Sequence, residues 1–190
     1  MTKLKVSFLI GCLLLVNGCA ALVATSAVVG TDMVTDRRSA GIYIEDQNIE
    51  LKAKSALSAN TELNEQADIS STSYNRLVLL TGQAPSAALK RRATDIVRSI
   101  DNVKTVHNEI KVRAPDSFLS STSDAWITTK AKSLLLAEKD LDSTHIKVVT
   151  ENGDLFLMGI VSRAEAKHAI AVVRKIKGVE TVVEVFEYMD

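Results

Sequence analysis

Residues 146–161 read Ile-Lys-Val-Val-Thr-Glu-Asn-Gly-Asp-Leu-Phe-Leu-Met-Gly-Ile-Val, and this stretch decides the fold of the C-terminal part of the chain. On each side of Asn152-Gly153, apolar or β-branched residues recur at every second position. Such alternation is typical of a β-strand with one buried face. Asn-Gly fits a two-residue hairpin turn because both residues accept a positive φ. The stretch therefore predicts a β-hairpin.

The segments on either side of this hairpin have a different periodicity. Residues 124–137 and 163–176 place apolar residues at the spacing of amphipathic helices, and Lys177-Gly178 ends the second of them. A last strand is expected at about residues 180–188. The predicted order is helix, strand, strand, helix, strand, an α+β arrangement in which two helices cover one face of a three-stranded sheet.

The same unit occurs earlier in the chain. Ala53-Lys54-Ser55-Ala56-Leu57 recurs as Ala131-Lys132-Ser133-Leu134-Leu135, and Leu80-Thr81-Gly82 recurs as Leu157-Met158-Gly159. The offset between the two copies stays between 76 and 78 residues. An internal repeat of this length indicates a tandem duplication, so we expect two domains with the same αββαβ order.

The repeat also divides the chain. The stretch after the first copy contains Pro115 and many serines, which is typical of a linker. The stretch before the first copy is rich in Ala, Val, Ser and Thr, and we interpret it as a tether. The expected division is a signal peptide at 1–18, a lipidated tether at 19–43, domain 1 at 44–113, a linker at 114–123 and domain 2 at 124–190.

The start of the chain has the features of a secretory signal. Lys3 and Lys5 precede an apolar core, Val6 to Val16, that is too short to span a bilayer. The segment ends Leu-Val-Asn-Gly-Cys at residues 15–19, which resembles the lipobox of bacterial lipoproteins. That resemblance implies cleavage before Cys19 and covalent lipid, including palmitate-type acyl chains, on this residue. The alternative is an ordinary secretory signal that happens to contain Cys19.

Cysteine count and charge agree with this interpretation. Cys12 would leave with the signal, so Cys19 would have no disulfide partner. Ala20 follows it, which resembles the pattern of lipoproteins sorted to the outer membrane. Removing Lys3 and Lys5 from 23 basic residues leaves 21 against 23 acidic residues, a net charge of about −2. Binding to an anionic surface would therefore need a local patch.

The second copy resembles the BON domain. Its leading helix is followed by Asn152-Gly153-x-Leu155-x-Leu157-x-Gly159-x-Val161, a second helix and then Gly178-Val179-x-x-Val182. The first copy departs from the pattern, with Asn75-Arg76 at the turn and Asn102-Val103 after the second helix. Asn tolerates left-handed backbone, so we expect a helix to stop at Asn102.

The whole chain is similar to the dual-BON outer-membrane lipoproteins of the DolP type. A lipobox, Thr35-Asp36-x-Arg38-Ser39-x-Gly41 and two BON-like domains follow one another. The resemblance implies a protein that is not an enzyme, that is anchored in the outer membrane and faces the periplasm, and that binds phospholipid, particularly anionic lipid. It also implies a role in envelope integrity.

Comparing the two copies singles out a candidate binding face. Aligned on the shared core face, Trp126 falls on Asn48, so the only Trp of the chain is expected to be exposed. The predicted lipid-binding residues are Trp126, Lys130, Lys132 and Leu136. In this hypothesis the indole inserts at the bilayer interface while the lysines contact headgroup phosphates. The alternative is that Trp126 packs against the linker at Phe118 or against domain 1.

No catalytic or metal-binding constellation is evident in the sequence. His107, His145 and His168 fall on different predicted elements, without metal-ligand spacing, and each is interpreted as a solvated surface residue. No cofactor is expected beyond the lipid on Cys19. Lys90-Arg91-Arg92 is interpreted as a solvated basic run or a secondary lipid contact.

The expected partners are therefore membrane phospholipid and, as a second possibility, envelope proteins; nucleic acid is not expected for an exported lipoprotein. The alternative function is a scaffold for envelope assembly or for peptidoglycan-remodelling factors. Salt separates the two hypotheses, because binding through a few lysines weakens at high ionic strength whereas apolar docking does not.

Overall fold

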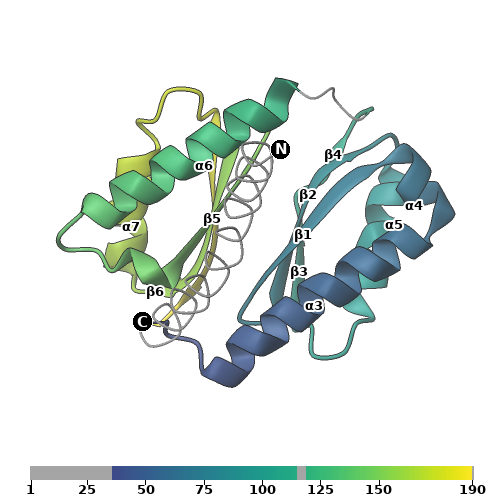
Figure 1. Ribbon diagram of the computed structural model, residues 1–190, viewed down its shortest axis with the longest axis horizontal. Coiled ribbons are helices and arrows are strands. Elements are labelled where there is room, and N and C mark those ends of the chain that lie inside the picture. Colours follow the sequence, from purple (N-terminus) through teal and green to yellow (C-terminus); the bar gives the residue numbers. More distant parts are fainter. Residues whose placement is uncertain (1–35, 115–118, 190) are drawn as a thin grey trace, which may run out of the picture. The chain divides into compact units, whose positions relative to one another are not determined.

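Two copies of an αββαβ unit follow one another in the computed structural model, which describes residues 36–114 and 119–189 (Figure 1). Arg37–Asp190 form a single unit by their internal contacts. The predicted signal peptide and Cys19 lie outside the described residues. The α+β fold expected from the repeat is confirmed.

The first copy contains a hairpin with a parallel third strand. Strands β1 and β2 are antiparallel, and β2 pairs in parallel with β3 and, further along, with β4. Its elements are α3 (Ala40–Ala59), α4 (Thr61–Gln66), β1 (Asp68–Tyr74), β2 (Leu77–Ala84), α5 (Ala87–Arg98), β3 (Thr105–Asn108) and β4 (Lys111–Val112).

The second copy repeats this topology in a three-stranded sheet with β6 in the centre. Its elements are α6 (Leu119–Ala137), the 3₁₀ turn η3 (Ser143–His145), β5 (Ile146–Glu151), β6 (Asp154–Val161), α7 (Arg163–Val173) and β7 (Thr181–Tyr188). The strand that is continuous as β7 is divided into β3 and β4 in the first copy.

Both leading helices begin earlier than the sequence predicts. Helix α3 starts at Ala40, inside the predicted tether, because the Ser39 side chain caps it by accepting a hydrogen bond from the Ile42 amide. Helix α6 starts at Leu119, inside the predicted linker. Serine and threonine are weak helix formers rather than breakers, so a helix anchored by its buried C-terminal turns can extend through them.

Each hairpin turn is held by a carboxylate of its own leading helix. Asn75 and Arg76 have φ values of 52° and 66°, and the Asp46 carboxylate accepts hydrogen bonds from both of their amides at 2.8 Å. In the second copy the Asp124 carboxylate accepts from Asn152 and Gly153 at 2.7 and 3.0 Å. The aspartates thus satisfy amide groups that a tight turn leaves without partners.

A left-handed residue follows the second helix of each copy, but neither helix extends as far as that residue. Asn102 has a φ of 68° after α5, and Gly178 has a φ of 94° after α7. The prediction that a helix stops at Asn102 is wrong, because α5 ends at Arg98 with Ser99 as its C-cap and Asn102 lies in the turn that follows.

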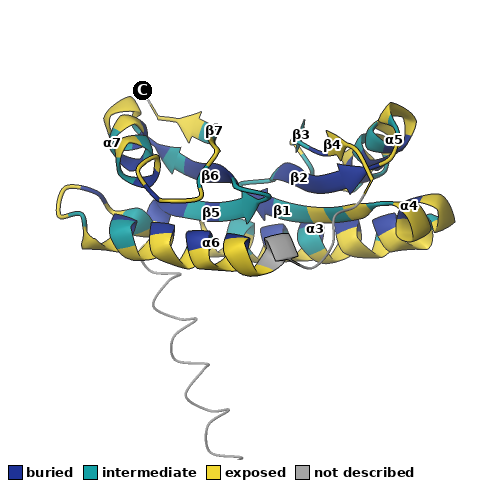
Figure 2. Ribbon diagram, turned by 90° about the horizontal axis from the view of Figure 1, so that it is seen from above, coloured by how far each residue is buried: buried dark blue, intermediate teal, exposed yellow. Residues whose placement is uncertain are grey.

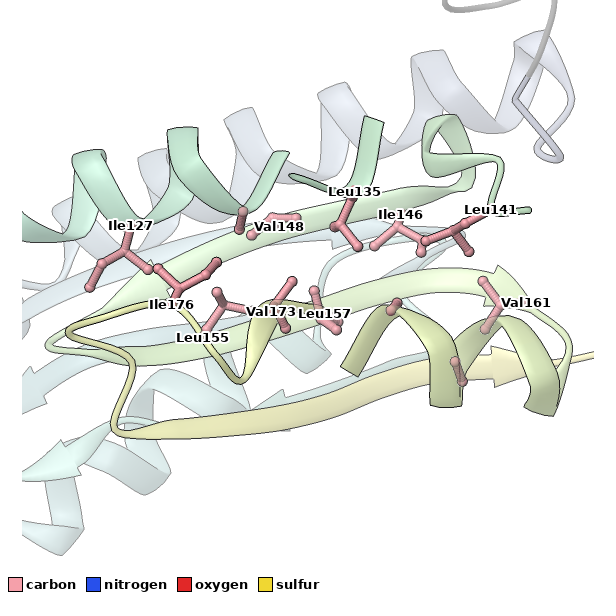
Figure 3. Packing of buried hydrophobic residues seen from close by; sticks show 13 residues of the cluster. Ile127, Leu135, Leu141, Ile146, Val148, Leu155, Leu157, Val161, Val173 and Ile176 are labelled. Carbon is pink, nitrogen blue, oxygen red and sulfur yellow. The ribbon is translucent and has the colours of Figure 1, made fainter. Parts of the chain in front are cut away.

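Each copy has its own hydrophobic core between its helices and one face of its sheet. The aligned pairs that define the shared core face are all buried, as predicted: Ile49 and Ile127, Ala53 and Ala131, Leu57 and Leu135. Figure 3 shows the core of the second copy, where α6, α7 and β6 contribute side chains to one cluster. The first copy has the equivalent cluster.

The opposite face of each sheet is buried as well, which the alternation of apolar residues does not predict. Tyr74 and Leu79 of the first copy pack with Phe156, Met158 and Val185 of the second in one cluster. A signal was present in the sequence, because β6 reads as an almost unbroken apolar run, and such runs are typical of strands buried on both faces.

Polar contacts accompany this cluster. The Tyr74 hydroxyl donates to the His145 carbonyl at 3.1 Å, and Lys147 Nζ lies 2.7 Å from Glu50 Oε1 and 3.3 Å from the Ser73 carbonyl. His145 is only 8% exposed, so the prediction that it is a solvated surface residue is wrong. Its position directly before β5 places it against the paired sheets, which periodicity in one copy could not reveal.

Two arginines before α3 contact different copies. Arg37 makes two hydrogen bonds to the Glu165 carboxylate, at 2.7 and 2.9 Å, and a third to the Ile160 carbonyl. Arg38 pairs with buried Asp46 at 2.7 Å, and its guanidinium lies 3.9 Å from the centre of the Tyr74 ring. The end of the predicted tether is therefore part of the folded unit.

The Arg37 and Glu165 pair predicts a specific pH dependence. Hydrogen bonds from Arg37 lower the pKa of Glu165 from 4.5 to about 2. Because the folded-state value is the lower one, the pair contributes stability above pH 4.5 and loses it as the pH falls towards 2. We expect Glu165→Gln to lower the free energy of unfolding at neutral pH and to make little difference near pH 2.

Urea unfolding of the parent chain and of Glu165→Gln between pH 7 and pH 2 measures this difference. Glu65→Gln, which changes an exposed glutamate of α4, is the control for removing one acidic charge. If the parent and Glu165→Gln differ in free energy of unfolding by the same amount at every pH, the stabilising role assigned to the Arg37 and Glu165 pair is contradicted.

Candidate functional site

The outward face of α6 presents the residues that the sequence singles out. Trp126 is 54% exposed and Leu136 is 75% exposed, while Lys130 and Lys132 are also exposed. Figure 2 shows the buried stripe of this helix turned towards the sheet and the exposed stripe turned away from it. The predicted exposure of Trp126 is confirmed. The proposed packing partner Phe118 lies outside the described residues.

Helical geometry gathers these four side chains on one surface. Trp126 and Lys130 are one turn apart, as are Lys132 and Leu136, and the row of Thr129 and Ser133 lies between these two rows on the outward face. From Trp126 to Leu136 the helix rises by about 15 Å. The surface thus has an apolar residue near each end and two ammonium groups between them.

The hydroxyl groups on this surface are bonded to the helix itself. Thr129 Oγ1 donates to the Ala125 carbonyl, and Ser133 Oγ donates to the Thr129 carbonyl, both at 2.9 Å. A hydroxyl that bonds back to its own helix has less need of water. The face is therefore less polar than its sequence indicates.

Its charge is one-sided. Asp124 is the only acidic residue in α6, and it is buried with its carboxylate on the hairpin turn. Within the described residues, neither Lys130 nor Lys132 has an ion-pair partner among the recorded contacts. The face can therefore offer two unpaired cations to an anionic ligand.

The equivalent face of α3 differs in the ways that the sequence comparison indicated. Asn48 replaces Trp126, Ser58 replaces Leu136, and Glu50 replaces Thr128. Glu50 is bonded to the Ser73 amide and to Lys147 Nζ, so this acid has a structural role. The two helices share a fold but present different surfaces.

Each of the three histidines lies beside a single carboxylate. Among the described residues, no three His, Cys, Asp or Glu side chains come together in a way that could hold a metal ion. His107 lies 2.8 Å from Glu109, and His168 lies 2.9 Å from Glu138, each as an isolated pair. His145 lies 3.2 Å from the carboxylate of Asp142.

The pKa of Asp142 is lowered, mainly because its carboxylate accepts a hydrogen bond from the Thr144 hydroxyl.

The sequence analysis did not predict that Asp46 and Asp124 hold the hairpin turns. Their signal was available, because an aspartate stands three residues before the shared Ile in both copies.

Comparison with protein families identifies the repeated unit. The model of the BON domain matches residues 45–114 and 123–190. The chain belongs to the BON-domain family. Both copies of the αββαβ unit are BON domains, so we refer to them below as the first and second BON domains.

Known proteins are similar to this chain over most of its length. The outer membrane lipoprotein DolP of Haemophilus influenzae is 34% identical over 98% of this chain and 96% of its own length. A 21 kDa hemolysin of Actinobacillus pleuropneumoniae is 38% identical over 81% of this chain and 79% of its own. Osmotically-inducible protein Y of Escherichia coli is 27% identical over 96% of each chain.

None of the described helices is both long enough and apolar enough to cross a membrane.

Proposed function

We propose that this protein is a lipoprotein of the bacterial envelope, held in the outer membrane by lipid on Cys19 and facing the periplasm. In this proposal the second BON domain binds anionic phospholipid through α6 and so supports envelope integrity, without enzymatic activity or a further cofactor. The similarity to a protein named outer membrane lipoprotein over nearly the whole chain supports the location.

The observation that carries the binding proposal is the outward face of α6. It combines an exposed indole, an exposed Leu side chain and two lysines without ion-pair partners, with its one acid buried. Trp is favoured at the interface between water and lipid. Each lysine near an anionic surface contributes about 1 kcal/mol. A monolayer of anionic headgroups matches this arrangement better than a neutral one.

The fluorescence of Trp126 tests the proposal directly, because it is the only Trp of the chain. The protein for this test is the chain from residue 19 onward with Cys19→Ser, so that it stays in solution. We expect a blue shift on adding phosphatidylglycerol vesicles, none with phosphatidylcholine vesicles, and a reversal of the shift at high salt.

Paired lysine variants provide the matched control. Lys130→Gln with Lys132→Gln should weaken vesicle binding about 30-fold, the equivalent of two lysines at 1 kcal/mol each. Lys52→Gln with Lys54→Gln changes the corresponding positions of the first BON domain and should leave binding unchanged. Equal loss in both double variants, or no shift with either vesicle, would contradict the proposal and favour a protein-binding scaffold.

A further inference from the structure

The first BON domain has a groove between α3 and the outer side of β1. The groove has a volume of about 480 Å³, and its walls include Leu51 and Lys54 of α3 and Ile69 and Ser71 of β1. A second hollow of about 180 Å³ continues it towards α4, and both hollows are lined by Leu57. Figure 1 shows α3 running beside β1 along this edge of the sheet.

Comparison of the two BON domains explains why this groove is open. Counted from the hairpin turns, Ser71 of β1 corresponds to Val148 of β5. Val148 is 4% exposed and belongs to the core beneath α6. A serine side chain is smaller than valine and is polar, so the first domain leaves space where the second has a packed side chain. The shared fold does not require this space.

The strand beside the groove is an edge strand. Within the described residues β1 pairs only with β2. In an antiparallel pair, successive residues direct their amide and carbonyl groups alternately to the partner strand and away from it. The Ser73 amide points away from β2, because it donates to Glu50 at 2.8 Å. By this alternation, the amides and carbonyls of Ser71 and Ile69 also point away from β2, towards the groove.

The end of β1 nearest the hairpin turn is already occupied. Glu50 accepts the hydrogen bond of the Ser73 amide, and Lys147 Nζ lies 3.3 Å from the Ser73 carbonyl. Neither group reaches Ser71 or Ile69 in the recorded contacts. The edge therefore has a blocked part and an open part, and the open part coincides with the groove.

We propose that this edge is a peptide-binding site at which an extended segment of a partner protein adds a strand to β1. Backbone groups arranged along an edge are matched by another extended backbone, whereas a lipid acyl chain has no donors or acceptors for them. The added strand pairs with Ile69 and Ser71 and stops before Ser73. This site lies in the first BON domain and is separate from the lipid-binding face of α6.

The lining of the groove defines the side chains that it accepts. Leu51, Leu57 and Ile69 supply apolar contacts, and the vacant space beside Ser71 suits a β-branched or small apolar side chain. Glu50 is already paired with Lys147, and the contacts expected with the peptide are apolar packing and backbone hydrogen bonds rather than ion pairs. Binding should therefore change little with salt, unlike binding of an anionic headgroup.

Nuclear magnetic resonance of the isotope-labelled chain from residue 19 onward, with Cys19→Ser, tests the proposal. The probe is a pool of short peptides with Val, Ile or Thr at alternate positions. The control is the same pool with N-methyl groups on alternate amides, which keeps the side chains and removes the strand-forming donors. We expect amide shifts at Ile69 and Ser71 with the first pool at both low and high salt, and none with the second.

Two variants sharpen the test. Ser71→Val fills the groove as Val148 does in the second domain, and it should weaken binding at least tenfold while the chain remains folded, as judged by its amide spectrum. Thr72→Val, on the opposite face of the same strand, should leave binding unchanged. Four results would overturn the proposal: no shifts with the peptide pool, equal shifts with the N-methylated pool, shifts confined to α6, or unaltered binding by Ser71→Val.

Phosphatidylglycerol vesicles separate this site from the proposed lipid-binding function. Vesicles should shift α6 amides without competing with the peptides at β1. Displacement of the peptides from β1 by vesicles would contradict the peptide site. If the vesicles do not bind but the peptides still shift the β1 amides, only the lipid proposal is contradicted.

Discussion

Replacing Asp46 by Ala should lower the free energy of unfolding by about 3–5 kcal/mol, the typical cost of removing one partner from a buried ion pair. Asp46 is fully buried and pairs with Arg38, whose side chain is 6% exposed. Its carboxylate also accepts hydrogen bonds from the Ser73 hydroxyl and from the two amides of the hairpin turn. The variant leaves a buried guanidinium and two turn amides without that acceptor.

The equivalent residue of the second BON domain provides a graded comparison. Asp124 accepts hydrogen bonds from two turn amides, but in the recorded contacts it has no arginine partner. Asp124→Ala should therefore cost less, about 2–3 kcal/mol, close to the cost of leaving buried donors unsatisfied. Urea unfolding followed by circular dichroism measures both values. A smaller loss for Asp46→Ala than for Asp124→Ala would contradict the role assigned to Arg38.

Replacing Gly82 by Ala should destabilise the first BON domain by about 3 kcal/mol or more, because a positive φ and a backbone clash act together. Gly82 has a φ of 109°, and a Cβ atom built on it would lie 2.0 Å from the carbonyl oxygen of Asp68. Asp68 belongs to the paired strand β1, so relief of the clash requires β1 and β2 to separate at that end.

Two further glycines separate the effect of the backbone clash from the effect of the positive φ. Gly159 of β6 has no positive φ, but its Cβ would lie 2.4 Å from the His145 carbonyl oxygen, so Gly159→Ala isolates the clash. Gly41, in the first turn of α3, has space for a Cβ, with its nearest neighbour at 3.9 Å. Gly41→Ala should stabilise the chain by about 0.5–1 kcal/mol, since Ala is the better helix former.

Thermal unfolding of the three glycine variants measures the order of their stabilities. We expect the midpoint to fall for Gly82→Ala and Gly159→Ala and to rise for Gly41→Ala. A midpoint for Gly82→Ala within error of the parent would show that β1 can move away from β2 without cost, which would contradict the pairing described above.

Local periodicity and the internal repeat correctly predicted the αββαβ order and one exposed residue, but they did not predict the short helix α4. The alternation around Asn152-Gly153 predicted the second hairpin, and the shared spacing of Ile49 and Ile127 predicted the core face of both leading helices. The same alignment predicted the exposure of Trp126, because a position occupied by Asn48 in the other copy does not require burial. These inferences depend on residues close together in the chain or on two copies of one fold.

Features that join distant segments were decided only by tertiary structure. Arg37 bonds to Glu165 across 128 positions of sequence, and the Tyr74 hydroxyl donates to the carbonyl of buried His145 across 71 positions. The space beside Ser71 exists because α3 is set beside an edge strand with a small side chain at that point.

Amino-acid sequence by itself thus determined the repeated αββαβ unit, its hairpin turns and the polarity of each helix face, since these follow from backbone preferences and hydrophobic spacing within one element. Tertiary structure decided which second faces of the sheets are covered, which arginine meets which carboxylate, and where a strand edge stays open. The physical reason is that burial and ion pairing depend on the packing of whole elements, which no local pattern of residues specifies.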